Sequence, residues 1–269
     1  MSIITTQIIK VSGDQSVTKA DHLVVEEPLE IRLEYNAAHG VYRAMNLAVT
    51  MRTPGHDDDL INGFLFTESI IESIAQITGI TYPEENLAIV KLKEDVSFDP
   101  KSLERNFFAS SSCGICGKAS IESIKSETKY LPWTSKFSID LVTVKSLKNI
   151  MSDHQQLFNQ TGGNHSCALF DQDGKLTSIR EDVGRHNAMD KLIGSNDDFP
   201  LQRHGVLVSG RASFELVQKA SKAGIGMMVA IGAPSSLAVQ LANEQGMTLV
   251  GFLKEDSFNI YCGAERISS

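Results

Sequence analysis

Two cysteines separated by two residues dominate the chemistry that this sequence could perform. Cys113 and Cys116 stand in the run Ser110-Ser111-Ser112-Cys113-Gly114-Ile115-Cys116-Gly117-Lys118. A cysteine thiol has a pKa of about 8.5, and both the adjacent lysine and a helix start, which we expect at residues 119–124, would lower that pKa. The glycines keep the segment open. We therefore predict a mobile loop whose thiolate attacks or carries sulfur.

Three other interpretations of the cysteine pair stay open at this point. A structural zinc site uses four ligands, usually from two paired motifs, and the remaining cysteines, Cys167 and Cys262, stand alone in the sequence. A thioredoxin-like disulfide exchanger carries its CxxC at a strand-to-helix junction near the start of a βαβ unit, whereas this pair lies in mid-chain without a strong strand before it. The third alternative is two incidental cysteines in a surface loop.

Two arginine-containing turns are candidates for binding an anion. Gly184-Arg185-His186-Asn187 begins a predicted helix, where backbone amides and an arginine can hold phosphate, although Asp182 could instead cap that helix. Ser209-Gly210-Arg211-Ala212-Ser213 follows the apolar strand 206–208, where parallel sheets leave a ligand crevice. Its structural alternative is a tight turn with Ser213 as a helix N-cap. The resulting candidate cofactor contacts are Arg185, His186, Ser209 and Arg211.

Three more polar features have structural explanations at least as good as their functional ones. Gly232-Ala233-Pro234-Ser235-Ser236 occupies the next such turn, and its hydroxyls could contact a ligand or cap a helix. His165 follows two glycines and could serve as a base or cofactor contact, although lone histidines are more often structural. His56 precedes three aspartates, which favours part of a helix start over a metal ligand.

Composition limits the possible partners and the cellular location. The chain has 269 residues, is 42% hydrophobic and carries a formal net charge of −8, so it can bury a sizeable core and is a poor general match for nucleic acid or an anionic membrane. The start of the sequence lacks the features of a signal peptide, and no run of about 18 to 20 apolar residues could span a membrane. Four cysteines do not suggest a disulfide framework. We expect a cytoplasmic protein.

Residues 1–95 are predicted to form a small α+β domain. Residues 6–11, 29–35 and 47–51 are short stretches rich in β-branched or alternating apolar residues, a pattern typical of strands. A helix over residues 57–72 begins with three aspartates, which suit its positive end, and its apolar residues should pack on the sheet. Two further strand candidates cover residues 77–82 and 87–92.

Residues 96–138 are predicted to be a connecting segment with the CxxC loop, and residues 139–269 a C-terminal α/β domain. Helices are expected at 142–159, 186–193, 214–222 and 236–245, alternating with strands at 168–170, 176–180, 206–209, 227–231, 248–252 and 258–261. Such alternation implies a mostly parallel sheet covered on both faces. The chain as a whole is therefore of mixed α+β class.

Four separate motifs resemble those of the formate dehydrogenase accessory sulfurtransferase family, FdhD/NarQ. They are Ser112-Cys113-Gly114-Ile115-Cys116-Gly117-Lys118, Thr161-Gly162-Gly163-Asn164-His165, Glu181-Asp182-Val183-Gly184-Arg185-His186-Asn187-Ala188-Met189-Asp190-Lys191 and Ser209-Gly210-Arg211-Ala212-Ser213-Phe214-Glu215. Several ordered motifs spread over most of the chain are far more specific than one CxxC. The resemblance implies a carrier that takes sulfur from a cysteine desulfurase to the molybdenum cofactor, bis(molybdopterin guanine dinucleotide), before its insertion into formate dehydrogenase.

The resemblance also assigns residues. It implies that Cys113 carries the persulfide and that Cys116 is an assistant or second relay thiol. It places guanine dinucleotide binding in the segment Phe252, Leu253, Lys254, Glu255, Asp256 and Ser257. Glu255 and Asp256 depart from a basic phosphate clamp, which leaves the individual contacts of this segment open. A homodimer is expected from the family.

The family's C-terminal fold resembles cytidine deaminases, which implies a three-layer αβα architecture for residues 139–269. Cytidine deaminases bind zinc through a His or Cys and a later Pro-Cys-x-x-Cys. The corresponding stretches here, Arg185-His186-Asn187-Ala188 and Pro234-Ser235-Ser236-Leu237, lack both cysteines of the second motif. We therefore expect neither zinc nor deaminase activity. A chaperone that binds the cofactor without moving sulfur remains a second hypothesis.

Overall fold

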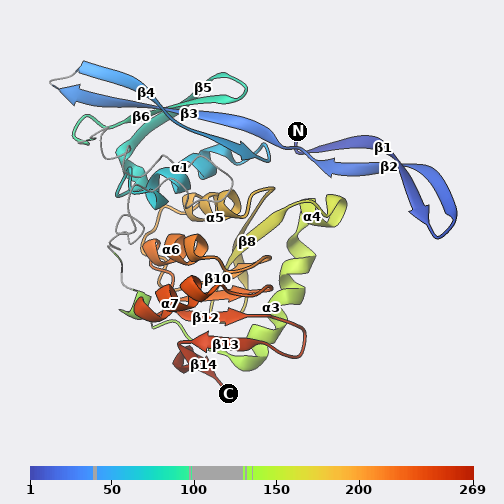
Figure 1. Cartoon of the computed structure of the whole chain (residues 1–269). Coiled ribbons are helices and arrows are strands. Elements are labelled where there is room, and N and C mark those ends of the chain that lie inside the picture. The colour runs from blue at the N-terminus through green and yellow to red at the C-terminus, as the bar shows by residue number, and fades with distance from the viewer. Residues whose placement is uncertain (39–40, 97, 99–129, 131, 135) are drawn as a thin grey trace.

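The computed structural model of the chain describes residues 1–38, 41–96, 98, 130, 132–134 and 136–269 (Figure 1). Cys113, Cys116 and the helix expected at residues 119–124 lie outside these described residues. Among the described residues, no helix combines the length and apolar character needed to cross a membrane.

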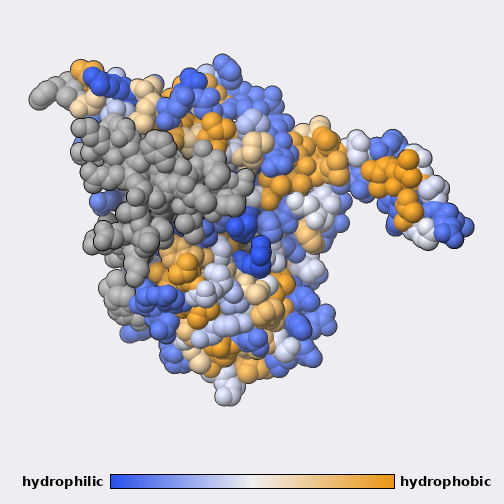
Figure 2. Space-filling view, in the orientation of Figure 1, coloured by the Kyte–Doolittle hydropathy of each residue, from blue (hydrophilic) through white to orange (hydrophobic). Residues whose placement is uncertain are grey.

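A two-stranded arm forms the N-terminus. Strands β1 (Ile3–Ser12) and β2 (Gln15–Val24) pair in antiparallel fashion around a turn in which Gly13 has φ 58°. The arm projects away from the rest of the molecule (Figure 1), and apolar side chains including Ile9, Val11 and Val17 lie exposed on it (Figure 2). The sequence predicted only part of β1, because an exposed ribbon leaves no buried face to create a hydrophobic pattern.

A four-stranded sheet follows the arm, with strand order β4-β3-β6-β5. The strands are β3 (Glu27–Ala38), β4 (Val41–Arg52), β5 (Ile77–Glu84) and β6 (Leu87–Leu92). β3 and β6 are parallel, and the other two pairs are antiparallel. Leu29, Ile31 and Leu33 alternate along β3 and are completely buried, as expected for a strand with one face on the core.

Helix α1 (Asp57–Thr67) connects β4 to β5 and contributes Leu60, Ile61 and Leu65 to the same core. Its first turn carries the three aspartates, as predicted from the sequence. The helix ends five residues earlier than the expected end at residue 72, because Ser69 adopts a left-handed conformation with φ 64°. A short 3-10 helix (Ile74–Gln76) then leads into β5.

The C-terminal sheet has six strands in the order β13-β12-β11-β10-β8-β9. Their bounds are β8 (His165–Phe170), β9 (Leu176–Asp182), β10 (Gly205–Val208), β11 (Met227–Ala230), β12 (Thr248–Gly251) and β13 (Asn259–Cys262). β10, β11 and β12 are parallel neighbours, but β8 is antiparallel to both β9 and β10, and β13 is antiparallel to β12. The prediction of a mostly parallel sheet was therefore right for the centre and wrong for the margins, where β8 and β13 run antiparallel to their neighbours.

Helices cover both faces of this sheet. They are α3 (Leu141–His154), α4 (Gln156–Thr161), α5 (Arg185–Gly194), α6 (Phe214–Lys222) and α7 (Ser236–Glu244). The predicted helix over residues 142–159 is broken at Gln155, whose side chain donates a 2.8 Å hydrogen bond to Ser166 on β8. A 3-10 helix (Pro132–Thr134), β7 (Ile139–Asp140), a 3-10 helix (Ala264–Arg266) and β14 (Ile267–Ser268) complete the described elements, and β7 pairs with β14.

Alternation along the strands divides the interior into two clusters. Leu207 of β10 points into a cluster with α3, while Val206 and Val208 of the same strand point into a cluster with α5, α6 and α7. The second cluster also contains the core of the four-stranded sheet and α1, so hydrophobic packing is continuous between the N-terminal and C-terminal parts. The domain boundaries at residues 95/96 and 138/139, and the likeness to cytidine deaminases, stay predictions.

Helices α1 and α5 cross at very short range, which ties these two parts together. A Cβ atom on Gly63 would lie 1.8 Å from the carbonyl oxygen of Asp190, and one on Gly194 would lie 2.0 Å from that of Asp59. Side chains at either position would push the helices apart. The start of α5 is therefore held in a fixed relation to the N-terminal sheet.

Candidate functional site

Four polar turns meet at one edge of the six-stranded sheet. The turns follow β9, β10, β11 and β12, and the first residue of β8 joins them because β8 runs in the opposite direction. Backbone hydrogen bonds connect the turns: Ser209 donates to Ser166 (3.0 Å), Gly232 donates to Gly210 (2.9 Å), and Phe252 donates to Gly232 (3.0 Å). The structure thus brings these turns together, although the sequence singled them out separately; the Cys113–Cys116 segment lies outside the described residues.

A basic cluster lies on the α5 side of this edge. The ring of His165 packs against Gly210, whose Cβ, if present, would lie 3.3 Å from Nδ1 of the histidine. Burial lowers the pKa of His165, and the positive charges of Arg185 and Arg211 lower it further, while the carboxylate of Asp182 acts in the opposite direction. Both arginines therefore act electrostatically on the same imidazole, and their combined positive charge favours an anion at this edge.

The N-terminus of α5 is open. Gly184 is its N-cap residue, and no side chain caps the helix within the part of the chain that the structure describes. Asp182 is not the cap: its Oδ1 accepts a 2.8 Å hydrogen bond from the amide of Gly184, which precedes the first turn. The amides of that first turn and the guanidinium of Arg185 can therefore bind phosphate or another anion.

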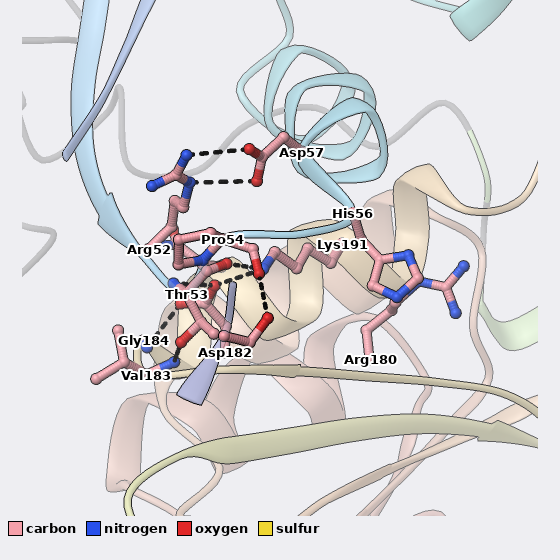
Figure 3. A network of polar contacts seen from close by, with 12 residues as sticks. Arg52, Thr53, Pro54, His56, Asp57, Arg180, Asp182, Val183, Gly184 and Lys191 are labelled. Atoms are coloured by element: carbon pink, nitrogen blue, oxygen red, sulfur yellow. Dashed lines mark hydrogen bonds and ion pairs between the residues drawn. The ribbon is translucent and has the colours of Figure 1, made fainter. Parts of the chain in front are cut away.

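The turn before α5 is clamped by completely buried polar groups (Figure 3). Oδ2 of Asp182 lies 2.7 Å from Nζ of Lys191 and accepts a 3.0 Å hydrogen bond from the amide of Thr53. Lys191 also donates to the carbonyl of Thr53 at 2.7 Å, and the amide of Val183 donates to the Thr53 hydroxyl at 3.1 Å. The exposed fractions of Asp182, Lys191 and Thr53 are 0%, 1% and 1%. We call Thr53, Asp182 and Lys191 the buried clamp.

The N-terminus of α6 lies next to that of α5 and is also open. Ser213 is its N-cap residue, as the sequence suggested, but its side chain makes no capping bond, and its hydroxyl has no hydrogen-bond partner among the described residues. Nε2 of His186 lies 3.9 Å from Glu215 in the first turn of α6. Burial, followed by the charges of Arg185 and Lys219, lowers the pKa of His186 to about 4, so this imidazole is neutral at physiological pH.

The turn after β11 has a structural role. The hydroxyl of Ser235 accepts a 3.2 Å hydrogen bond from the amide of Ala238 and so caps α7, which supports the capping interpretation for this serine. The amide of Ser235 also donates to the carbonyl of Ala212 at 3.0 Å. This turn thereby supports the neighbouring Arg211 turn.

The segment from Phe252 to Ser257 leaves the sheet beside these turns. Phe252 has φ 54° and a half-exposed ring, whereas Leu253 is 1% exposed and packs in the α3 cluster. Lys254, Glu255, Asp256 and Ser257 are exposed, and the amide of Lys254 donates to the carbonyl of Ser257 at 2.8 Å. The side chain of Leu253 therefore serves packing, and the exposed residues are the ones available to a ligand.

A hollow lies in the N-terminal part, at the start of α1. A cavity of about 510 Å³ is lined by Gly55, His56, Asp57, Asp58, Asp59, Tyr82 and Glu85, none of which belongs to the four motifs. His56 occupies the N-cap position of α1, in agreement with the helix-start interpretation. The hydroxyl of Tyr82 donates a 2.6 Å hydrogen bond to Asp58. His56 and Tyr82 therefore both have structural contacts at the start of α1.

The described cysteines are poor candidates for chemistry. Cys167 is buried, and burial raises its pKa, while Cys262 is half-buried and donates to the carbonyl of Met247. No three His, Cys, Asp or Glu side chains gather as a metal site within the described ranges. The absence of zinc stays a prediction.

Sequence reasoning missed Thr53 as a part of this site. Its partners Asp182 and Val183 lie 129 and 130 residues away in the chain. A threonine before a proline carries no local signal of such a contact. Asp182 and Lys191 lie within a recognised motif, but their pairing becomes evident only from the fold.

Comparisons with known proteins agree on one family. The model of the FdhD/NarQ family matches residues 24–268. The sulfur carrier protein FdhD of Streptomyces coelicolor is 43% identical and covers 97% of this chain and 94% of its own, and that of Mycolicibacterium paratuberculosis is 42% identical and covers 97% of each chain. A crystal structure from Desulfotalea psychrophila, described as a candidate formate dehydrogenase accessory protein, covers 100% of both chains at 24% identity with a TM-score of 0.77, so it shares the fold. The chain belongs to the FdhD/NarQ family.

Proposed function

We propose that this protein is a sulfur carrier that accepts sulfur from a cysteine desulfurase and delivers it to the molybdenum cofactor for formate dehydrogenase. The observation that carries the proposal is the family match, which includes the CxxC pair within residues 24–268 and is accompanied by full-length relatives named as sulfur carriers. Cys113 is the proposed carrier, because it is the first cysteine of the pair.

Loading is a thiol exchange that needs no external oxidant. The thiolate of Cys113 attacks the terminal sulfur of the persulfide on the desulfurase, the sulfur–sulfur bond of that persulfide breaks, and the desulfurase cysteine leaves as a thiolate. The product is a persulfide on Cys113. Sulfur is transferred without a net change in oxidation state.

Cys116 provides a route for release. Its thiolate attacks Sγ of Cys113, which forms a disulfide between the two cysteines and expels the terminal sulfur as hydrosulfide for delivery to the molybdenum of the cofactor. The two electrons that reduce this sulfur come from the cysteine pair. A cellular thiol must then reduce the disulfide before the next round.

The edge of the six-stranded sheet is the proposed binding site for the guanine dinucleotide part of the cofactor. Its pyrophosphates carry the negative charge that Arg185, Arg211 and the open N-terminus of α5 favour. His186 and Ser209 lie in the same two turns. The exposed carboxylates of Glu255 and Asp256 do not suit phosphate, but they can accept hydrogen bonds from the amino and imino groups of guanine.

Formate dehydrogenase activity in cells lacking their own sulfur carrier tests this function. Cys113→Ala should abolish activation and Cys116→Ala should lower it, whereas Cys262→Ala, a matched change at a half-buried cysteine outside the pair, should retain it. Full activation by Cys113→Ala would refute the carrier role. It would then favour a cofactor chaperone that binds the nucleotide without moving sulfur. We expect the active species to be a homodimer.

A further inference from the structure

The turn that leads into α5 is held by Thr53, the residue that directly follows strand β4 of the N-terminal sheet. The amide of Val183 donates to the hydroxyl of Thr53, and the amide of Gly184 donates to Asp182, which also accepts from the amide of Thr53. Both amides immediately before Arg185 are therefore satisfied by the buried clamp. The positions of these two amides therefore depend on the position of Thr53.

Strand β4 holds the first turn of α5 as well. The side-chain amide of Asn187 donates a 2.7 Å hydrogen bond to the carbonyl of Met51, and its oxygen accepts a 3.1 Å hydrogen bond from the hydroxyl of Thr50. Contacts to the start of α5 thus come from Thr50 and Met51 at the end of β4 and from Thr53 just after it (Figure 3 shows those of Thr53). The N-terminus of α5 is therefore fixed by hydrogen bonds from the N-terminal part as well as by its connection to β9.

We propose that Thr53 is a positioning residue for the anion-binding start of α5, although it is too deeply buried to touch a ligand. This inference rests on the proposed nucleotide site. The Thr53 hydroxyl fixes Val183, and through it the direction in which the free amides of α5 and Arg185 face the sheet edge. Phosphate binding by backbone amides depends on such preorganisation, because the amides cannot adjust independently of the helix.

The chain offers well-matched variants for a test. Thr53→Val keeps the shape of the side chain and both backbone bonds of the clamp but removes the acceptor of the Val183 amide. Thr53→Ser restores that acceptor. Thr248→Val is the control and makes the same chemical change at another completely buried threonine. The Thr248 hydroxyl donates to the carbonyl of Gly263 at the start of β12, which is the end of the strand away from the proposed nucleotide site.

The measurement is the affinity of the full-length protein for guanosine diphosphate, determined by calorimetry at a temperature at which circular dichroism shows every variant fully folded. Thr53→Val should weaken binding about tenfold, because a misplaced turn loses part of one charge-assisted interaction. Thr53→Ser should bind within about twofold of the wild type, which is well below the tenfold step of a lost interaction. Thr248→Val should bind as the wild type does.

The outcomes separate this inference from the proposed function. Equal affinities for Thr53→Val, Thr248→Val and the wild type would overturn the positioning role and leave the nucleotide site intact. A loss of affinity in both valine variants would also overturn it, because general destabilisation would then explain the effect. A wild-type protein that does not bind guanosine diphosphate at all would refute both the nucleotide site and the inference that rests on it.

Discussion

Removing the positive charge of the buried clamp should destabilise the fold strongly. In Lys191→Met, the carboxylate of Asp182 keeps its bonds from the amides of Thr53 and Gly184 but loses the ammonium group at 2.7 Å. At an effective dielectric constant of about 20, that contact represents roughly 6 kcal/mol of attraction, part of which is offset by the desolvation of both groups. We expect a loss of about 3–5 kcal/mol in the free energy of unfolding, the usual cost of leaving one buried charge without its partner.

Urea denaturation with an unchanged m-value provides the measurement, and two further variants sharpen it. Lys175→Met, an equivalent change at an exposed lysine, should shift the free energy of unfolding by less than about 0.5 kcal/mol. Asp182→Asn combined with Lys191→Met should cost at least about 2 kcal/mol less than the sum of the single changes, because the second change removes the unpaired charge. Additive effects, or a loss below about 1 kcal/mol for Lys191→Met, would refute the reasoning.

Two other predictions concern stability. Because burial lowers the pKa of His186 to about 4, the unfolded chain takes up a proton near pH 6.5 that the folded chain does not, so stability falls as pH decreases from about 6.5 to about 4. His186→Gln should remove ~2 kcal/mol of the decline between pH 7 and pH 5 in denaturant unfolding, and an equally steep decline in the variant would contradict this. Gly63→Ala places a methyl group 1.8 Å from the Asp190 carbonyl oxygen and should cost about 3 kcal/mol or more, whereas Gly79→Ala, in open space, should cost less than about 1 kcal/mol. Similar melting temperatures for these two alanine variants would show that α1 and α5 can separate without penalty.

The regular elements were predictable where burial imposes a pattern. β10, β11 and β12 are short apolar runs, and the helices between them have clear apolar faces, so the sequence predicted both their type and their approximate bounds. β2 was missed, because its residues are largely exposed on both faces. The break at Gln155 was missed as well, because a tertiary hydrogen bond to Ser166 accompanies it and no glycine or proline marks it.

The sequence predicted those parts of the site in which polar residues come directly after a strand. Arg185, His186, Ser209 and Arg211 lie in turns at one sheet edge, as the strand-and-helix alternation implied. The clamp could not be predicted, since Thr53 follows a strand of the other sheet and is 129 residues from Asp182 in the sequence. The roles of these residues toward the cofactor remain proposals.

The sulfur-carrier account is tested most directly by intact-protein mass spectrometry after incubation with a cysteine desulfurase and cysteine. The account predicts that the wild-type chain and Cys262→Ala gain the mass of one sulfur atom, that a thiol reductant removes it, and that Cys113→Ala gains nothing. No gain in the wild type with a demonstrably active desulfurase, or an undiminished gain in Cys113→Ala, would contradict the assignment of Cys113 as the carrier.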